Sequence, residues 1–337
     1  MRVEMVNFSS WEIRQNECFT QARISTNASS ASKIPAASAL ASRPRQLPDR
    51  AQAETVRLTM QSSNSFDIIP DQNSIAAVDR DIRFFPTSDE RSAVLSKESI
   101  ETWNRDGYLG PLDLYEKPEI LKIRDYFDEL LAKTLASGQD SYSISSAHLK
   151  HGRVWDMLNH PMLVSYVRDL LGEDVIGWGS HFFCKMPQDG KKVDWHQDCS
   201  YWPLTPSRAV TVWLAIDDAD AENGCMEVYT GSHLHGLIDF EASGSESGNV
   251  LNQSVKDPEK YGRHQLTPLS AGQISIHSDL LVHGSSPNDS NRRRCGLTLR
   301  YCPASVTAYL GWNRKGVVVS GQAPPKSWPG AKRPDSD

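Results

Sequence analysis

The fold is constrained most by a change in hydrophobic periodicity at Gly172. Beyond this residue the chain contains short runs rich in β-branched and aromatic residues, separated by Gly, Pro, Asn and Asp. Such runs are typical of antiparallel strands, because these side chains pack well on a pleated sheet. The expected strands are "VIGWGSHFFCKM" (175–186), "AVTVWLAI" (209–216), "GCMEVYT" (224–230), "GQISIHS" (272–278) and "CGLTLRYC" (295–302). This series predicts an antiparallel barrel or jelly roll.

Helical patterns precede the strands. Ser96 can cap a helix that continues through Asn104, and Gly107 can end it. In the segments 117–138 and 160–172 the apolar residues fall on one helical stripe. We therefore expect a mainly β fold with flanking helices packed on the outside of the jelly roll.

The sequence predicts one folded domain between two tails. Residues 1–60 are rich in Ser, Ala, Arg and Gln, and we expect them to form a disordered tail. Residues 61–95 are read as transitional, 96–312 as the folded domain and 313–337 as a C-terminal tail. Basic residues outnumber acidic ones in the first segment, which leaves an organelle-targeting peptide as an alternative interpretation.

Composition narrows the possible partners. A formal net charge of -6 and a pI near 5.9 give the chain no general attraction to a phosphate backbone, so nucleic acid is not an expected partner. No run approaches the roughly 18 apolar residues that span a bilayer. The cysteines lack CxxC spacing, which argues against a disulfide framework and a zinc knuckle. We expect a cytoplasmic protein, and no protein partner is evident.

A histidine and an aspartate lie one residue apart in "VDWHQDCSYW". In an extended strand His196 and Asp198 would point to the same side and could hold one divalent metal together with a second histidine. His277 and Asp279 form the same short pattern, upstream of His283. A site built from those three needs a turn, because six extended residues separate the outer ligands by roughly 20 Å. A site of His196, Asp198 and His283 is favoured, and the other remains open.

An anion site is predicted downstream of His283. In "RRRCGLTLRY", Arg294, Thr298 and Arg300 share one face of a regular strand, opposite Leu297 and Leu299. A buried arginine is costly unless an anion pairs with it, so a dicarboxylate co-substrate is a natural partner. The preceding Arg292 and Arg293 are interpreted as a solvated basic turn.

These segments resemble the phytanoyl-CoA dioxygenase family of Fe(II)- and 2-oxoglutarate-dependent oxygenases. The resemblance covers roughly residues 97–304 and is carried by "GWGSHFFCKMPQDGKKVDWHQDCSYW", "RAVTVWLAIDDADAENGCMEVYTGSH" and "LLVHGSSPNDSNRRRCGLTLRY". It implies a double-stranded β-helix, which is a cupin-like jelly roll. The implied site residues are the iron ligands His196, Asp198 and His283, then Arg294 for the far carboxylate of 2-oxoglutarate, then Lys185, Trp213 and Ser285 along the same pocket.

The resemblance also implies the chemistry. Fe(II), O2 and 2-oxoglutarate would oxidise an unactivated C–H bond of a small-molecule metabolite, with release of succinate and CO2 and with ascorbate as a stimulant. Because Asp198 is present, hydroxylation, desaturation or ring closure is favoured over halogenation. Specialised metabolism is a plausible setting. The expected substrate contacts are Trp195, Tyr201, Trp202 and Arg300.

Two other functions fit the same residues. One is a non-catalytic metal- or ligand-binding protein on the same barrel, in which the metal site is vestigial. The other is a cupin-like metalloenzyme that does not use 2-oxoglutarate. Conversion of 2-oxoglutarate into succinate separates the oxygenase from both.

Overall fold

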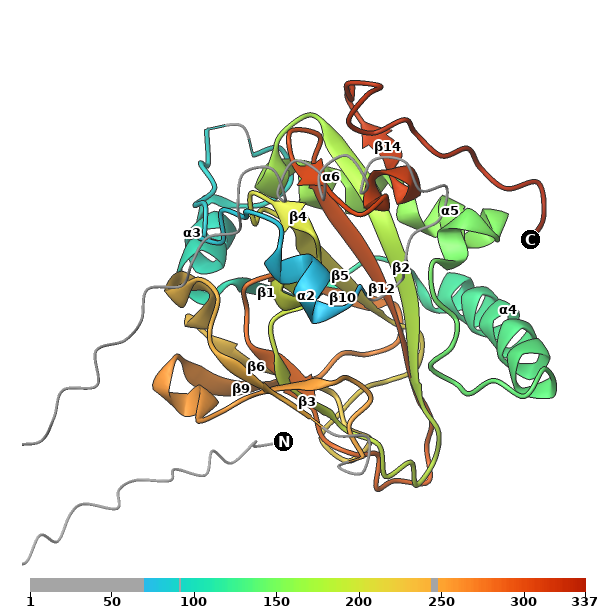
Figure 1. Ribbon diagram of the computed structural model, residues 1–337. Coiled ribbons are helices and arrows are strands. Elements are labelled where there is room, and N and C mark those ends of the chain that lie inside the picture. Colours follow the sequence, from blue (N-terminus) through green and yellow to red (C-terminus); the bar gives the residue numbers. More distant parts are fainter. Residues whose placement is uncertain (1–69, 91, 244–247) are drawn as a thin grey trace, which may run out of the picture. The chain divides into compact units, whose positions relative to one another are not determined.

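Two antiparallel sheets form the centre of the computed structural model, which describes residues 70–90, 92–243 and 248–337 (Figure 1). The larger sheet has the strand order β1-β10-β5-β12-β2-β14, and the smaller has the order β3-β11-β6-β9. The strands of the larger sheet are β1 (Tyr108–Asp113), β2 (Val175–Lys185), β5 (Val210–Ala215), β10 (Gln273–Ser278), β12 (Arg294–Pro303) and β14 (Val317–Ser320). Those of the smaller are β3 (Val193–His196), β6 (Met226–Thr230), β9 (Arg263–Thr267) and β11 (His283–Ser285). This arrangement confirms the predicted jelly roll.

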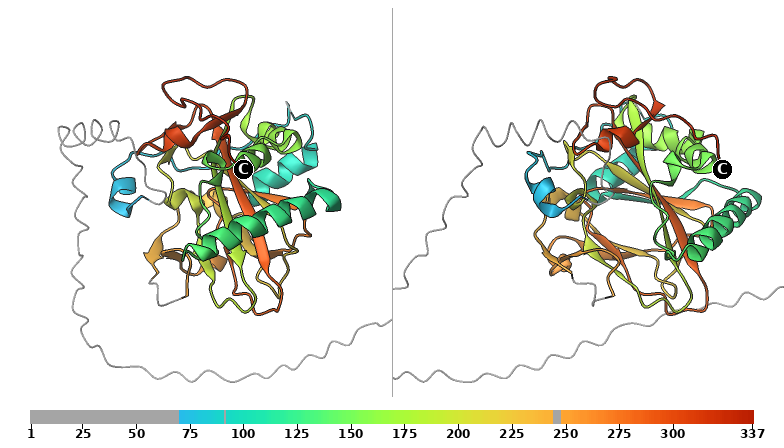
Figure 2. Two further views of the ribbon diagram at one scale, coloured as in Figure 1. Left: turned by 90° about the vertical axis from the view of Figure 1, so that its right-hand side faces the viewer. Right: turned by 45° about the vertical axis from the view of Figure 1, so that its right-hand side comes forward.

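Helices α3, α4, α5 and α6 pack on the core at the outer face of the larger sheet, whereas α2 lies away from them (Figure 2). Figure 2 shows α4 lying across the strands, and its Phe127 ring stacks on Phe182 of β2 with centroids 4.9 Å apart. Ser96 accepts a hydrogen bond from the Ser99 amide at the start of α3, and Gly107 ends that helix with φ 69. The helices are α2 (Gln72–Ala76), α3 (Lys97–Asp106), α4 (Lys117–Ala136), α5 (Gly152–Leu158) and α6 (Pro161–Leu171). Within the described ranges no helix is long and apolar enough to cross a membrane.

Smaller elements complete the described chain. Two-stranded pairs join β4 to β13 and β7 to β8. Their bounds are β4 (Leu204–Thr205), β7 (Phe240–Ala242), β8 (Gln253–Val255) and β13 (Thr307–Ala308). The 3-10 turns are η1 (Ala147–Leu149), η2 (Asp198–Ser200), η3 (Ser232–His235), η5 (Pro258–Lys260) and η6 (Trp312–Lys315).

Strand alternation separates the core from the interior of the roll. On β12, Leu297 and Leu299 are fully buried in the main core beneath the helices. Thr298 and Arg300, one residue along from each, line a pocket on the opposite face. The predicted alternation of apolar and polar side chains along β12 is therefore observed. The inner face of the larger sheet carries the polar side chains.

The structure differs from the expected boundaries in two places. The segment expected to be a C-terminal tail includes β14, which pairs with β2 at the edge of the larger sheet, and the buried Trp328. In the segment read as transitional, Arg80 donates hydrogen bonds to the carbonyls of Cys199 and Trp202, at 2.7 and 2.8 Å. The expected tail 1–60 lies outside the described residues.

A buried carboxylate ties α4 to the sheet. Asp217, just after β5, accepts hydrogen bonds from Arg293 Nε at 2.7 Å and from the Cys295 amide at 3.1 Å. Arg124 of α4 lies 2.9 Å from the same carboxylate. The side chain of Arg293 is only 14% exposed, so the interpretation of this residue as part of a solvated turn is wrong. The pairs join three segments that are distant in sequence.

Replacing Asp217 by alanine should lower the free energy of unfolding by about 3 kcal/mol, because the mostly buried Arg293 loses its buried partner and keeps, among its described carboxylate partners, only the half-exposed Asp128. Urea unfolding followed by circular dichroism measures the change. The exposed Asp239 supplies a matched control. Its replacement by alanine should cost less than about 0.5 kcal/mol, and equal losses in the two variants would contradict this role of Asp217.

Candidate active site

Three metal-binding side chains meet between the two sheets. His196 ends β3, Asp198 begins the turn η2, and His283 begins β11. One ligand atom from each lies within 4.8 Å of the others, and all three residues are buried. His196 and His283 are register partners in the smaller sheet, so strand pairing brings the two imidazoles together.

Asp198 lies beside His196 as expected, but it is not part of the same strand. The strand stops at His196, and Asp198 lies in a 3-10 turn rather than in the strand. Gln197 is still extended, with φ -113 and ψ 130, so the two ligand-type side chains keep the same direction. The Gln197 amide points the other way and donates to the carbonyls of Gly236 and Leu280, at 2.8 and 2.6 Å.

Backbone carbonyls orient both imidazoles. His196 Nδ1 lies 2.8 Å from the Asp194 carbonyl, and His283 Nδ1 lies 2.9 Å from the Leu281 carbonyl. A carbonyl can only accept, so each Nδ1 carries the hydrogen and each Nε2 keeps a lone pair for a metal. Burial lowers the pKa of both rings, which favours the neutral form that binds metal.

The carboxylate of Asp198 has two distinct sides. Its Oδ1 lies 3.9 Å from His196 Nε2 and faces the cluster. Its Oδ2 accepts a hydrogen bond from Thr211 Oγ1 at 2.7 Å and lies 3.6 Å from His277 Nε2. Burial raises the pKa of Asp198, but the neighbouring His277, His283 and Arg300 outweigh it and hold the pKa below its usual range. Two neutral imidazoles and an ionised carboxylate fit a divalent iron.

The alternative site of His277, Asp279 and His283 is not assembled. The ring of His277 does contact His283, with centroids 4.4 Å apart. The Asp279 carboxylate, however, accepts a hydrogen bond from Ser207 Oγ at 2.6 Å. In the described part of the chain, the ligand atoms that lie close enough to hold one metal ion belong to His196, Asp198 and His283, and Asp279 is not among them.

A small inner pocket of about 50 Å³ joins the cluster to Arg294. Two of the expected residues, Trp213 and Ser285, line it together with Thr298. Arg294 Nε and Nη2 donate to the Gly224 carbonyl, at 2.9 and 2.6 Å, and the guanidinium lies 5.3 Å from the Trp213 ring. Among the described residues no carboxylate forms an ion pair with Arg294. The pocket therefore ends in a buried cation suited to an anion.

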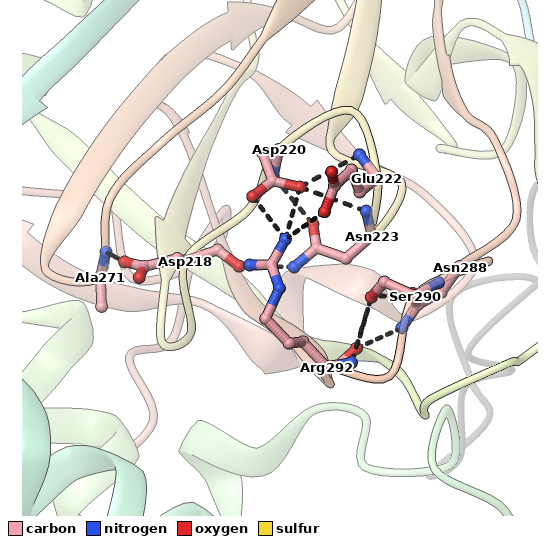
Figure 3. A network of polar contacts seen from close by, with 8 residues as sticks. All are labelled: Asp218, Asp220, Glu222, Asn223, Ala271, Asn288, Ser290 and Arg292. Atoms are coloured by element: carbon pink, nitrogen blue, oxygen red, sulfur yellow. Dashed lines mark hydrogen bonds and ion pairs between the residues drawn. The ribbon is translucent and has the colours of Figure 1, made fainter.

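A polar network holds the loop that carries Gly224 (Figure 3). Arg292 Nη2 lies 2.7 Å from Asp220 Oδ2, and Asn223 Nδ2 donates to the Asp218 carbonyl at 2.8 Å. The network joins the loop after β5 to the loop before β12. Gly224 has φ 72, and a Cβ there would lie 2.4 Å from the Ser286 carbonyl oxygen. Only glycine fits this close approach.

Two expected residues lie outside the pockets. The ammonium of Lys185 donates to the carbonyls of Ser285, at 3.2 Å, and Ser286, so it holds the strand after His283. Burial lowers its pKa to about 6. Trp195 packs against the rings of Tyr229 and His264, with centroids 4.7 and 5.7 Å away. The family resemblance implied that Lys185 lines the co-substrate pocket, but its ammonium is bound to the two serine carbonyls instead.

A larger outer cavity of about 440 Å³ opens on the other side of the cluster. Three expected substrate contacts, Tyr201, Trp202 and Arg300, line it. The sequence analysis did not select four further wall residues, which are Trp178, His181, Trp312 and Lys315. The alternation of side chains along β2 could have indicated His181. Trp178 lies where the pairing of β2 with β12 is irregular, and Trp312 and Lys315 come from the segment after β13. His196, Asp198 and Arg300 line both spaces, so the pockets meet at the cluster.

A jelly roll that encloses two histidines and one carboxylate is the architecture of mononuclear non-haem iron oxygenases. The family model described as Phytanoyl-CoA dioxygenase (PhyH) matches residues 103–296, more than half of the chain. The protein belongs to this family, whose members depend on Fe(II) and 2-oxoglutarate. The resemblance seen in the sequence is confirmed.

Known relatives are distant in sequence. A peroxisomal phytanoyl-CoA dioxygenase of Bos taurus is 24% identical over 63% of this chain and 70% of its own length. A probable alpha-ketoglutarate-dependent hypophosphite dioxygenase of Stutzerimonas stutzeri is 27% identical over 64% of this chain and 83% of its own. The solved apo structure of the non-heme monooxygenase ThoJ has a TM-score of 0.61 at 25% identity, over 70% of this chain and 88% of that one.

The buried Asp279 should make stability depend on pH. Burial raises its pKa from 3.8 to about 7, so between these values the folded state binds more protons than the unfolded state. Stability therefore falls as pH rises through this window, by at most about 1.4 kcal/mol per pH unit for this group. Asp279→Asn should gain stability relative to the parent protein at pH 7.5 compared with pH 5, measured by urea unfolding. A constant difference at both values would contradict the prediction.

Proposed function

We propose that the protein is a 2-oxoglutarate-dependent hydroxylase of a small-molecule metabolite. In this proposal His196, Asp198 and His283 bind Fe(II). The observation that carries it is the position of these side chains between two cavities, each lined by an arginine. The inner pocket would take the co-substrate and the outer cavity the substrate.

In the inner pocket the chain's own residues bind and orient 2-oxoglutarate. The guanidinium of Arg294 pairs with the far carboxylate of the co-substrate, while its bonds to the Gly224 carbonyl fix its direction. Trp213 forms a wall, which the absence of a side chain at Gly296 allows, since a Cβ there would lie 2.0 Å from the indole. The keto-acid end is thereby directed to the metal cluster.

Bound iron supplies the activation of O2 that converts 2-oxoglutarate to succinate and CO2 and oxidises a substrate C–H bond. The protein fixes the geometry and excludes water. Thr211 holds the Oδ2 atom of Asp198, which leaves Oδ1 directed at the cluster. A carboxylate held in this way cannot turn to offer a different oxygen, so the number of open positions on the metal stays fixed.

Hydroxylation is the outcome that we favour over desaturation or ring closure. The retained Asp198 occupies the place that a halide would need, which argues against halogenation. The two relatives described above are named as dioxygenases of different substrates. The same cluster can guide several oxidations, and the fate of the substrate radical depends on the cavity walls.

A non-catalytic binding protein is the second candidate. The retained ligand set and the unpaired Arg294 count against it, because a buried cation without a ligand destabilises the fold. A metalloenzyme that does not use 2-oxoglutarate is the third. The inner pocket counts against this function, because its polar end would then have no occupant.

The purified protein with Fe(II), ascorbate and O2 should convert 2-oxoglutarate into succinate, measured by mass spectrometry with and without candidate metabolites. Asp198→Ala should lower the rate by at least about a hundredfold, because it removes the anionic metal ligand. Asp239→Ala is the matched exposed control and should retain the parent rate. Succinate formation that is unchanged in Asp198→Ala would contradict the assignment of the ligands.

Arg294→Ala should raise the 2-oxoglutarate concentration needed for half-maximal succinate formation by about tenfold to a hundredfold, because a charge-assisted pair is lost. Arg294→Lys should recover part of the loss, since it keeps the charge but not the two-pronged geometry. Arg292→Ala, in the adjacent loop network, should have a smaller effect. Activity that is independent of added 2-oxoglutarate in the parent protein would favour the third candidate function instead.

A further inference from the structure

Three cationic side chains, Lys191, Arg300 and Lys315, lie in the wall of the outer cavity, on the substrate side of the metal cluster. Lys191 is paired with Asp140 at 3.0 Å. Arg300 of β12 lines both this cavity and the inner pocket, whereas Lys315 of η6 lines the outer cavity. Lys315 is 3% exposed. Arg300 and Lys315 come from segments that meet only in the folded chain. Neither has a role in binding the metal or 2-oxoglutarate in the proposed function.

Arg300 lies near the Asp198 carboxylate but makes no direct ion pair with it. Within residues 70–90, 92–243 and 248–337 its guanidinium donates no hydrogen bond to protein and forms no ion pair with a carboxylate, and its buried Nε has no partner. Its remaining contact is with the Trp202 ring, 5.3 Å from the guanidinium carbon. Burial lowers the pKa of this group. A buried guanidinium in this condition is costly unless a ligand pairs with it.

The surrounding chain keeps this cation in place. The stem of Arg300 lies over Gly179 of β2, where a Cβ would come within 3.1 Å of the arginine Cδ. Register pairing sets Arg300 beside Thr211, the residue that holds Asp198. The guanidinium is therefore held in the space beside the metal cluster, on a residue that is partly buried.

Lys315 adds a second positive charge to the same cavity. Its ammonium lies 3.4 Å from the Trp312 ring centroid, and its backbone carbonyl lies 3.1 Å from His148 Nε2. Burial and the charge of Arg300 lower the pKa of this lysine to about 7. An anion between the two groups would reduce their mutual repulsion and favour the charged lysine.

Aromatic rings form a second part of the wall, beside polar residues such as Ser180, His181 and Asn249. Trp178 contacts both Trp202 and Trp312, with ring centroids 4.6 and 5.3 Å apart. Tyr201 lines the same space. Such faces favour a flat or compact apolar body, because aromatic surfaces contribute large buried area with little loss of side-chain freedom.

We infer that the substrate is a small organic acid whose anionic group binds between Arg300 and Lys315 while its apolar body packs among the tryptophans. This inference rests on the proposed function, because it takes the outer cavity to be the substrate site. A carboxylate and a phosphonate present the same chemistry to the two cations. The co-substrate does not need Arg300, because Arg294 serves its far carboxylate.

Binding of matched acids and amides tests the inference. The full-length protein, loaded with Fe(II) and 2-oxoglutarate without O2, is titrated calorimetrically with indole-3-acetate, 3-phenylpropanoate and benzylphosphonate. The primary amides of the two carboxylates are the neutral controls. At least one acid should bind about tenfold or more tightly than its neutral counterpart, as expected for charge-assisted hydrogen bonds.

Three variants at Arg300 and Lys315 assign that preference to the cavity. Arg300→Gln should remove it, whereas Arg300→Lys should retain part of it because the charge remains. Lys315→Met should weaken acid binding by a smaller factor while keeping the aliphatic stem on Trp312. Arg263→Gln, at an exposed position of β9, is the matched control and should bind like the parent protein. Thermal unfolding of each variant identifies a loss that is due to misfolding.

Several outcomes would overturn the inference. These are failure of every acid to bind, amides that bind as tightly as acids, and an acid preference that survives Arg300→Gln in the folded protein. Loss of the charge-transfer absorption of the Fe(II)–2-oxoglutarate complex in Arg300→Gln would assign this arginine to the co-substrate instead. Absence of succinate formation by the parent protein would count against the proposed function, whereas the acid preference is read from binding alone.

Discussion

The hydrogen bonds from two imidazole Nδ1 atoms to backbone carbonyls are the interactions on which the site depends. His196 donates to the Asp194 carbonyl and His283 to the Leu281 carbonyl, so both rings are fixed by their own strands. A ring turned over would present an N–H to the cluster and could not bind metal there. Because the two histidines are register partners, the strand pairing that forms the smaller sheet also sets the distance between them.

The larger sheet contributes the charges around this cluster. Thr211 pairs with His277 on one side and Arg300 on the other, so one row across three strands faces Asp198. The outer face of the same strands is apolar and lies beneath the helices. Each strand therefore stabilises the fold with its apolar face and forms the site with its polar face. The apolar core on one side of the sheet offsets the cost of the cations on the other side.

Local sequence patterns predicted much of this arrangement. The five expected strands are β2, β5, β6, β10 and β12, and the period-two alternation correctly separated Arg294 and Arg300 from Leu297 and Leu299. The interpretation of Arg293 as part of a solvated turn was wrong, because its partner Asp217 follows another strand. The contacts of Trp195 and Lys185 were not predicted, because local patterns give the direction of a side chain but not its reach or its neighbours.

The sequence by itself determined the strand series, the direction of the side chains along each strand and the residue types of the cluster. These properties follow from the spacing of apolar residues and from the side-chain types within short segments. Only the tertiary structure decided whether His283 joins His196 and Asp198 or joins the other histidine–aspartate pair, since the side chain of Asp279 in that pair bonds to a serine instead. It also brought Lys315 to the outer cavity, because contacts between segments far apart in the chain depend on packing that no local pattern encodes.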